Sequence, residues 1–360
     1  MAKTKKRTQT GRLGLKEFLL SLFLMVLVWA GKELLSSGPQ DVVLDPQGQI
    51  QVLFTRPGAP NPGTPLDELL ASAIDDAQQS VDVAAFDFDL ADVADALVRA
   101  DKRGVRVRFV TDTDYMDELG PQRLRQAHIP VVTDDREPFM HDKFVVIDGR
   151  EVWTGSWNLT DNGTYRNDNN AVVLDSKNLA DNYTTEFEEM FTDRAFGASS
   201  PDNTPHPKVD INGVLLENLF ESEGDARSRI VALLEDAKAS IYFMAFALTD
   251  DDIARVIRDQ QRAGLAVQGV VESRNVTGSG SDVEALQKSG VDVLPDGNPY
   301  VMHHKVIIID EAIVITGSYN FSASAADSND ENVLIIHSPE IAARYMTEFR
   351  RVYEQAKEAQ

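Results

Sequence analysis

Beyond residue 63 the apolar and polar positions follow two alternating periodicities. Residues 80–86 form a largely apolar, β-rich run, which predicts a buried strand. Thr64-Pro65 is an N-cap and first-turn pair for a helix through Gln78, and residues 91–103 place apolar side chains three or four positions apart, as an amphipathic helix does. Gly104 is placed to end the second helix before a further strand at 105–111. Strands that alternate with helices predict an α/β fold whose sheet is covered on both faces.

This succession of elements occurs twice. The run SVDVAAF at 80–86 matches SIYFMAF at 240–246, and Gly104 matches Gly264, all at an offset of 160. MHDKFVVID at 140–148 matches MHHKVIIID at 302–310, at an offset of 162. We therefore expect a duplicated α/β unit. Its second copy is predicted to contain helices at 226–238 and 250–263 and strands at 240–246 and 265–271.

The first 32 residues differ from the rest. They carry a net charge of +6, and an apolar run at 18–31, broken only by Ser21, follows the basic stretch. The run of 14 residues suits a signal-peptide core and is shorter than the roughly 20 that span a bilayer. A signal peptide or a short signal anchor is expected. Either would place the body outside the cytoplasm, in the cell envelope.

Composition and charge narrow the class of protein. The 360 residues are 42% hydrophobic and 26% charged, which is typical of a globular chain of about two domains. Without cysteine there is no disulfide, thiol nucleophile or thiolate metal site. The predicted divisions are a basic N-terminus with its signal peptide or anchor at 1–32, a spacer with the first strand at 33–63, a first half at 64–195, a linker at 196–210 and a second half at 211–357.

Each half carries the pattern His-x-Lys-x4-Asp-x6-Gly-Ser-x-Asn. In an extended strand alternate side chains share a face, so the His and Lys of each copy should project together. Two facing copies would collect two imidazoles, two ammonium groups and two carboxamides in one anion-binding pocket. The Gly is expected to permit close approach of a ligand. The matching residues are His141, Lys143, Asp148, Gly155, Ser156 and Asn158, and His303, Lys305, Asp310, Gly317, Ser318 and Asn320.

With two such motifs the chain resembles the phospholipase D superfamily, whose HKD motif is present twice and intact. The resemblance covers about residues 64–357. It implies an α/β/α sandwich in each half, one active site between the halves, and metal-independent phosphodiester chemistry through a phosphohistidine, with no cofactor. It also implies that His141, Lys143, Asp148, His303, Lys305 and Asp310 form the catalytic set.

Physical reasoning distributes the roles within that set. One neutral imidazole attacks phosphorus and the other protonates the departing alcohol. The lysines, Asn158 and Asn320 are expected to stabilise the phosphate oxygens, with Ser156 and Ser318 as possible helpers. The motif aspartates are more plausibly supporting groups, because five residues beyond the Lys they no longer share its place on the strand.

A residue 28 positions past each motif His is expected to orient the ring, as the resemblance implies. It is Asn169 in the first copy and Glu331 in the second. A carboxylate favours imidazolium, whereas an amide orients the ring without favouring its charge. We therefore expect Asn169 to hold His141 as the neutral nucleophile, and Glu331 to hold His303 as the general acid.

Other polar and aromatic residues receive structural interpretations. His304 should point away from the pocket by strand parity, and His128, His206 and His337 have no partner pattern. Trp153, Trp157 and Tyr319 suit core packing better than a substrate wall.

Three function classes remain open. The favoured one is a phospholipase D-type phosphodiesterase that hydrolyses a glycerophospholipid head group or transfers it to an alcohol at a membrane surface. The alternative is an envelope or secreted endonuclease of the same superfamily. The body after residue 32 carries a net charge of −29, which argues against tight binding of a polyanion. A catalytically dead scaffold is disfavoured because every motif position is present. No protein partner is required, since both halves lie in one chain.

Overall fold

The structure is a computed structural model that describes residues 48–59, 63–224 and 226–360. The expected signal segment at 1–32 and most of the spacer lie outside the described residues. Within the described part, no helix has both the length and the continuous apolar run that a bilayer crossing requires.

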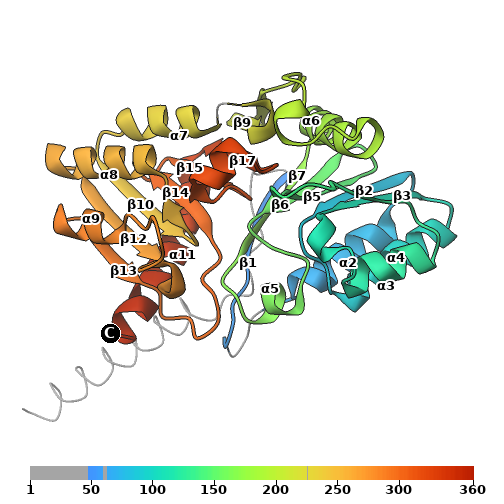
Figure 1. Ribbon diagram of the computed structural model, residues 1–360, viewed down its shortest axis with the longest axis horizontal. Coiled ribbons are helices and arrows are strands. Elements are labelled where there is room, and N and C mark those ends of the chain that lie inside the picture. The colour runs from blue at the N-terminus through green and yellow to red at the C-terminus, as the bar shows by residue number, and fades with distance from the viewer. Residues whose placement is uncertain (1–47, 60–62, 225) are drawn as a thin grey trace, which may run out of the picture. The chain divides into compact units, whose positions relative to one another are not determined.

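The first half builds a mixed seven-stranded sheet in the order β1-β7-β6-β5-β2-β3-β4 (Figure 1). β2, β3 and β4 are parallel neighbours, whereas β5, β6, β7 and β1 pair antiparallel. The strands are β1 (Ile50–Phe54), β2 (Ser80–Ala85), β3 (Arg106–Thr111), β4 (Val131–Thr133), β5 (Lys143–Ile147), β6 (Glu151–Gly155) and β7 (Asn170–Asp175).

The second half repeats this order. Its sheet runs β13-β12-β10-β14-β15-β17-β9-β8, which matches the first sheet strand for strand and adds β8 at one edge. The duplication read from the sequence is therefore present as two mixed sheets. The strands are β8 (Lys208–Ile211), β9 (Val214–Phe220), β10 (Ser240–Ala245), β12 (Ala266–Val271), β13 (Asp292–Pro295), β14 (Lys305–Ile309), β15 (Ile313–Gly317) and β17 (Asn332–His337), with a separate parallel pair β11 (Leu248–Thr249) and β16 (Phe321–Ser322).

Helices cover each sheet on its outer side and fill the space between the sheets (Figure 1). α2 (Leu66–Asp76), α3 (Ala91–Lys102) and α4 (Leu119–Gln126) share an apolar core with the first sheet. α7 (Ala226–Glu235), α8 (Asp251–Ala263) and α9 (Val283–Lys288) do the same for the second. A third core joins both sheets to α6 (Lys177–Glu188) and α11 (Pro339–Glu358). This central core fixes the two halves against each other.

Short elements make the connections. They are α5 (Asp161–Tyr165), α10 (Ala323–Asp327), the 3₁₀ turns Thr113–Tyr115, Gly197–Ser199, Glu221–Glu223 and Ser273–Asn275, and one π-helical turn, Glu189–Asp193.

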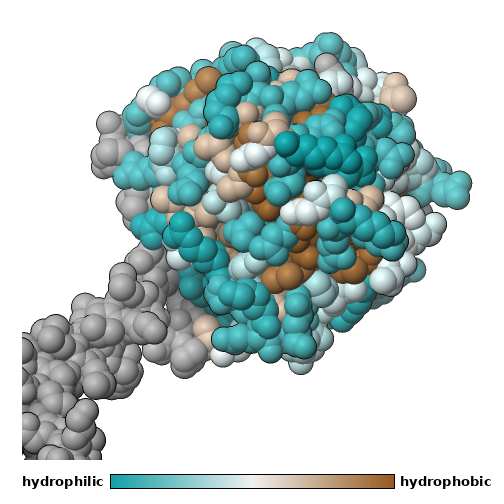
Figure 2. All heavy atoms as spheres, turned by 90° about the vertical axis from the view of Figure 1, so that its left-hand side faces the viewer, coloured by the Kyte–Doolittle hydropathy of each residue, from teal (hydrophilic) through white to brown (hydrophobic). Residues whose placement is uncertain are grey.

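The helices and strands expected from periodicity are confirmed. Pro65, rather than Thr64, is the N-cap of α2, in an extended conformation and without a side-chain cap hydrogen bond, and α3 and β3 follow as expected. Gly264 adopts φ 98° directly after α8, the left-handed conformation that ends helices at glycine. Figure 2 shows that the face on the left of Figure 1 is mostly hydrophilic, with small apolar patches between charged side chains.

Candidate active site

The two motif segments meet at the junction of the halves through exchanged backbone hydrogen bonds. The backbone N–H of His141 donates to the carbonyl of Asp330 at 3.0 Å, and that of His303 donates to the carbonyl of Asp168 at 2.8 Å. Each histidine is therefore anchored beside the start of a strand from the opposite half, β17 or β7.

The ring partners cross between the halves in the same way. Nδ1 of His141 lies 2.8 Å from Oε2 of Glu331, and Nδ1 of His303 lies 3.0 Å from Oδ1 of Asn169. The expected pairing of Asn169 with His141 and of Glu331 with His303 is wrong. The residues that orient the rings were found, but each serves the other half's histidine, because the backbone exchange brings His141 next to Glu331 rather than Asn169.

Hydrogen bonds fix the ring orientation on both sides. Nδ1 of His303 faces two acceptors, the backbone carbonyl of Ser156 at 3.1 Å and Oδ1 of Asn169. The amide nitrogen of Asn169 donates to the carbonyl of Gly163 at 3.0 Å, which sets the amide orientation. Nδ1 of His303 therefore carries the proton, as does Nδ1 of His141 against the carboxylate. This leaves Nε2 of each ring with a free lone pair.

The two lysines lie against the histidines of their own motifs. Nζ of Lys143 donates to the carbonyl of His141 at 2.7 Å, and Nζ of Lys305 donates to that of His303 at 3.0 Å. Both lysines are almost fully buried, with no carboxylate in direct contact among the described residues. Such ammonium groups offer their remaining protons to an anion.

The charges of these groups act on one another. Burial lowers the pKa of His141 and of His303 well below the ordinary value, and the charges of Lys143 and Lys305 lower the pKa of both rings further. Burial also lowers the pKa of Lys143 to about 8 and that of Lys305 well below its ordinary value. Burial raises the pKa of Glu331 to about 7, against the opposing effect of the lysines. A bound anion would relieve this excess of positive charge.

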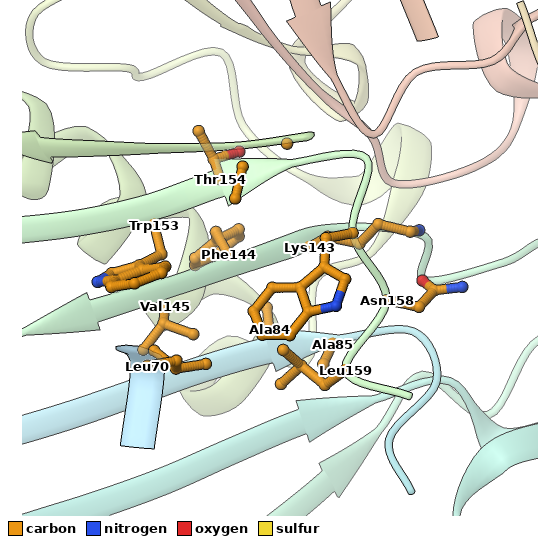
Figure 3. A pocket seen from close by; sticks show the side chains of 13 residues that line it. Leu70, Ala84, Ala85, Lys143, Phe144, Val145, Trp153, Thr154, Asn158 and Leu159 are labelled. Carbon is orange, nitrogen blue, oxygen red and sulfur yellow. The ribbon is translucent and has the colours of Figure 1, made fainter. Parts of the chain in front are cut away.

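The motif carboxamides are available to a ligand. The Oδ1 atoms of Asn158 and Asn320 are buried without a hydrogen-bond partner among the described residues. Figure 3 shows the side chains of Lys143 and Asn158 directed to the same side of the strand ends, above an apolar cavity with room for about one water molecule. An amide oxygen only accepts hydrogen bonds, so a contact with phosphate oxygens would have to come from the Nδ2 groups, and the role of the amides in phosphate binding stays a prediction.

The motif serines support the orienting residues. Oγ of Ser156 donates to Oδ1 of Asn169 at 2.9 Å, and Oγ of Ser318 donates to Oε2 of Glu331 at 2.6 Å. Each serine is fully buried, and its hydroxyl proton is already used in this hydrogen bond. The serines were expected to help bind the phosphate. Their hydroxyl groups instead bind the residues that orient the histidines.

The motif aspartates do not belong to the catalytic set, which corrects that part of the expectation. Asp148 directly follows β5, at the opposite end of the strand from Lys143 and about 16 Å away at the usual rise of a strand. Its carboxylate accepts backbone hydrogen bonds from residues 78, 79 and 80, at 2.9, 2.7 and 3.0 Å. Asp310 accepts the same three bonds from residues 238, 239 and 240. Both aspartates tie the end of a helix to the start of a strand.

The motif glycines are required by close packing of the backbone rather than by a ligand. A Cβ on Gly155 would lie 2.4 Å from the carbonyl oxygen of Asn170, and one on Gly317 would lie 2.2 Å from that of Asn332. Both have positive φ, 146° and 135°. The glycine allows the neighbouring strand to approach closely, so the expectation of close approach by a ligand is not supported.

Comparison with known proteins gives this geometry a family. Residues 70–191 and 230–353, more than half of the chain, match the family model described as "Cardiolipin synthase, PLD-like domain". The chain belongs to the phospholipase D-like family. The match falls once on each half, in agreement with the duplicated sheets.

Individual proteins are similar to this phospholipase D-like chain over part or most of its length. Human mitochondrial cardiolipin hydrolase is 35% identical over 130 residues, which is 36% of this chain and 52% of that protein. A phospholipase D of Rickettsia bellii is 32% identical over 150 residues, 40% of this chain and 75% of that protein. The alignment thus spans about half the length of the human relative. Phosphatidylserine synthase of Haemophilus influenzae has the same fold, with a TM-score of 0.67, 14% identity, and coverage of 90% of this chain and 89% of that one.

Sequence reasoning missed several parts of the phospholipase D-like site. The ring of Phe86 packs edge-on against His141 and lies 5.0 Å from Nζ of Lys143. Phe246 takes the equivalent position beside His303, with Nζ of Lys305 4.8 Å from its ring. Both phenylalanines end the repeated strand runs at 80–86 and 240–246, so the internal repeat could have identified them.

Two acidic residues that hold the motif segments were also missed. The backbone N–H of Met140 donates to Asp112 at 3.0 Å, and that of Met302 donates to Glu272 at 2.8 Å. Both follow equivalent strands, β3 and β12. They were overlooked because one is an aspartate and the other a glutamate, so the repeat does not match letter for letter.

His304, Trp153, Trp157 and Tyr319 are buried, as expected, whereas His128 is exposed and His206 and His337 are partly exposed. His304 lies between Asn170, at 3.2 Å, and Glu348, at 3.3 Å. Trp153, Trp157 and Tyr319 all pack in apolar cores, Trp153 and Trp157 with the first sheet and Tyr319 with the second.

Proposed function

We propose that the protein hydrolyses a glycerophospholipid head group, or transfers it to an alcohol, through a covalent phosphohistidine. The observation that carries the proposal is the buried pair of imidazoles, each with a free Nε2, beside two almost fully buried lysines. This arrangement binds an anion and supplies two groups that can move a proton or form a bond to phosphorus.

The comparisons support a lipid substrate. The relatives named above are a cardiolipin hydrolase and a phospholipase D. The net charge of −29 after residue 32 favours a substrate with isolated phosphodiesters over a polyanion. An export or anchor segment at 1–32 would bring the site close to a membrane surface, and we propose an envelope location on that ground.

The first step forms the covalent intermediate. Nε2 of one histidine donates its lone pair to phosphorus, a P–N bond forms, and the P–O bond to the leaving alcohol breaks. The second histidine gives its proton to the departing oxygen. Lys143, Lys305 and the amides of Asn158 and Asn320 would stabilise the charge on the non-bridging oxygens. The site's cations are thus supplied by side chains, and we propose that catalysis requires no metal.

The second step regenerates the enzyme. Water, or an acceptor alcohol, attacks phosphorus and loses its proton to the histidine that acted as acid. The P–N bond breaks and the first histidine returns to its neutral form. Both steps need one neutral and one charged imidazole. Binding of the anionic substrate favours protonation of the ring that must be charged.

We assign His141 as the nucleophile and His303 as the general acid, on a different ground from that of the sequence. When a neutral imidazole attacks phosphorus, its ring becomes positively charged, and the carboxylate of Glu331 at Nδ1 stabilises the charge as it develops. The neutral amide of Asn169 leaves His303 a stronger acid. The ground-state argument applied to the observed pairing would reverse the roles, and burst kinetics of the two histidine variants distinguish the two assignments.

The function is tested on the full-length chain and on His141→Ala. Each is incubated with micelles of phosphatidylcholine or cardiolipin containing ethanol, and separately with single-stranded DNA, with and without EDTA. Head-group release or phosphatidylethanol formation by the wild type, absent in the variant, supports the proposal. Nicking of DNA without lipid turnover would replace the proposal with a nuclease. Loss of activity in EDTA, while circular dichroism shows an intact fold, would contradict the metal-free mechanism.

A further inference from the structure

Three glutamates outside the phosphodiester site gather where α6 ends. Glu186 lies in α6, Glu189 begins the π-helical turn that follows it, and Glu223 lies in the 3₁₀ turn before α7. Each contributes a carboxylate oxygen, and these three oxygens all lie within 4.8 Å of one another. Glu186 and Glu189 are three residues apart on a helix and so share one face. Segments from both halves therefore bring three carboxylates to one point.

Two of these carboxylates are buried and only half satisfied. Oε1 of Glu186 accepts a hydrogen bond from Ser222 at 2.9 Å, and Oε2 of Glu189 accepts one from Ser200 at 2.5 Å. Oε2 of Glu186 and Oε1 of Glu189 have no hydrogen-bond partner among the described residues. Yet the two side chains are only 1% and 3% exposed. A buried carboxylate oxygen without a donor is costly and calls for a ligand.

Among the described residues, no basic side chain forms an ion pair with the three glutamates. Within residues 48–59, 63–224 and 226–360, no ion pair joins a lysine, arginine or histidine to Glu186, Glu189 or Glu223. Burial raises the pKa of all three, and the charges of Asp142 and Asp330 raise that of Glu186 further. The surroundings of the cluster are thus negative as well as poorly solvated.

We propose that Glu186, Glu189 and Glu223 bind one divalent cation of the calcium type. Calcium prefers hard oxygen ligands at about 2.3–2.6 Å, so two oxygens on one ion lie at most about 5 Å apart. The measured limit of 4.8 Å satisfies this condition for all three carboxylates. Oε2 of Glu186 and Oε1 of Glu189, which have no donor among the described residues, would gain the ion as their partner.

The cation would fasten the linker to both halves. Ser200 and Thr204 of the linker donate hydroxyl hydrogen bonds to Glu189 and Glu223, and Ser222 donates to Glu186. The ion would hold the end of α6, the linker and the turn before α7 together. Its role is structural, because the cluster shares no residue with the phosphodiester site. The inference is therefore independent of the proposed activity.

Binding is tested by isothermal titration of the metal-stripped full-length protein with CaCl₂, MgCl₂ or MnCl₂, together with thermal unfolding. We expect one calcium ion per chain and a Tm that rises with calcium concentration, because a ligand that binds only the folded state stabilises it. Glu189→Gln should weaken binding at least about tenfold by removing one anionic ligand. Glu235→Gln, an exposed site at the end of α7, should bind calcium like the wild type.

Several outcomes would overturn the proposal. If no divalent ion binds saturably to the wild type or raises its Tm, the carboxyls are neutralised by protons instead. If Glu189→Gln binds calcium as tightly as the wild type, the ion sits elsewhere. The wild-type titration decides the question even where the variant does not fold. His141→Ala should retain calcium binding, so a failure of the phosphodiesterase proposal would leave this result unaffected.

Discussion

Glu331 in the second half hydrogen-bonds Nδ1 of His141 in the first half, across 190 residues of chain and at 2.8 Å. The carboxylate also accepts bonds from Ser318 and Asn329, which fix its position. A histidine from one half and its carboxylate from the other form a single unit. Neither half alone contains a complete nucleophile, so the duplicated architecture is a condition of the proposed chemistry.

Glu331→Gln should lower kcat by about 10²–10⁴-fold with a much smaller effect on KM. The amide can still accept the hydrogen bond from His141, but it cannot stabilise the positive charge that develops on the ring. Phospholipid turnover measured with Glu340→Gln, an exposed glutamate, as the matched control checks this. A kcat within about threefold of the wild type would show that the carboxylate only supports the fold.

Much of the fold could be predicted from the sequence because its causes are local. The apolar runs at 80–86 and 240–246, and the glycines that follow the helices, determine strands and helix ends wherever the segments pack. The repeat then required the two sheets to share a strand order, as β4-β3-β2-β5-β6-β7-β1 and β13-β12-β10-β14-β15-β17-β9 do.

The crossed histidine pairing could not be predicted because a duplicated sequence hides it. Asn169 lies 28 positions after His141, and Glu331 lies 28 after His303, so spacing suggests pairs within each half. The observed pairs are 190 and 134 residues apart. Only the backbone exchange at Asp168 and Asp330 decides between the two arrangements, and no local pattern encodes it.

Removing the general acid should distinguish the catalytic roles of the two histidines. With bis(p-nitrophenyl) phosphate, whose phenolate leaves without protonation, His303→Ala should release a burst of about one equivalent of nitrophenolate and then stall. It can form the P–N bond but lacks the base for the second step. His141→Ala should give no burst. Rapid-mixing absorbance measures both, with wild-type turnover as the reference. A burst from His141→Ala and none from His303→Ala would reverse the assignment.

Alkaline pH should weaken substrate capture. Burial lowers the pKa of Lys143 to about 8, and that of Lys305 also lies well below its ordinary value. A lysine is charged below its pKa, so anion binding is retained below about pH 8 and lost above it. We expect kcat/KM, which reports the free enzyme, to fall above about pH 8. The fall in kcat should come at higher pH, because bound phosphate holds the lysine protons. A kcat/KM that stays constant to pH 10 at fixed ionic strength would contradict this.

Asp148→Asn should reduce stability rather than catalysis. The carboxylate accepts backbone N–H bonds from residues 78, 79 and 80, and these bonds hold its pKa below the ordinary value even though burial opposes them. Because the group is partly exposed, solvent screening limits the loss to about 1–2 kcal/mol of unfolding free energy. At 25 °C kcat should stay within about threefold of the wild type. Asp76→Asn, an exposed acid in α2, is the matched control.

The pH dependence of that loss identifies its cause. A carboxylate whose pKa is depressed in the folded state contributes its stability above the unfolded pKa of about 3.9, and loses it as pH falls through the folded pKa. Urea unfolding followed by circular dichroism should therefore give a constant difference between wild type and Asp148→Asn from pH 7 to pH 5. The difference should shrink below about pH 4. If the difference persists unchanged in acid, the charge of Asp148 is not what ties α2 to β2.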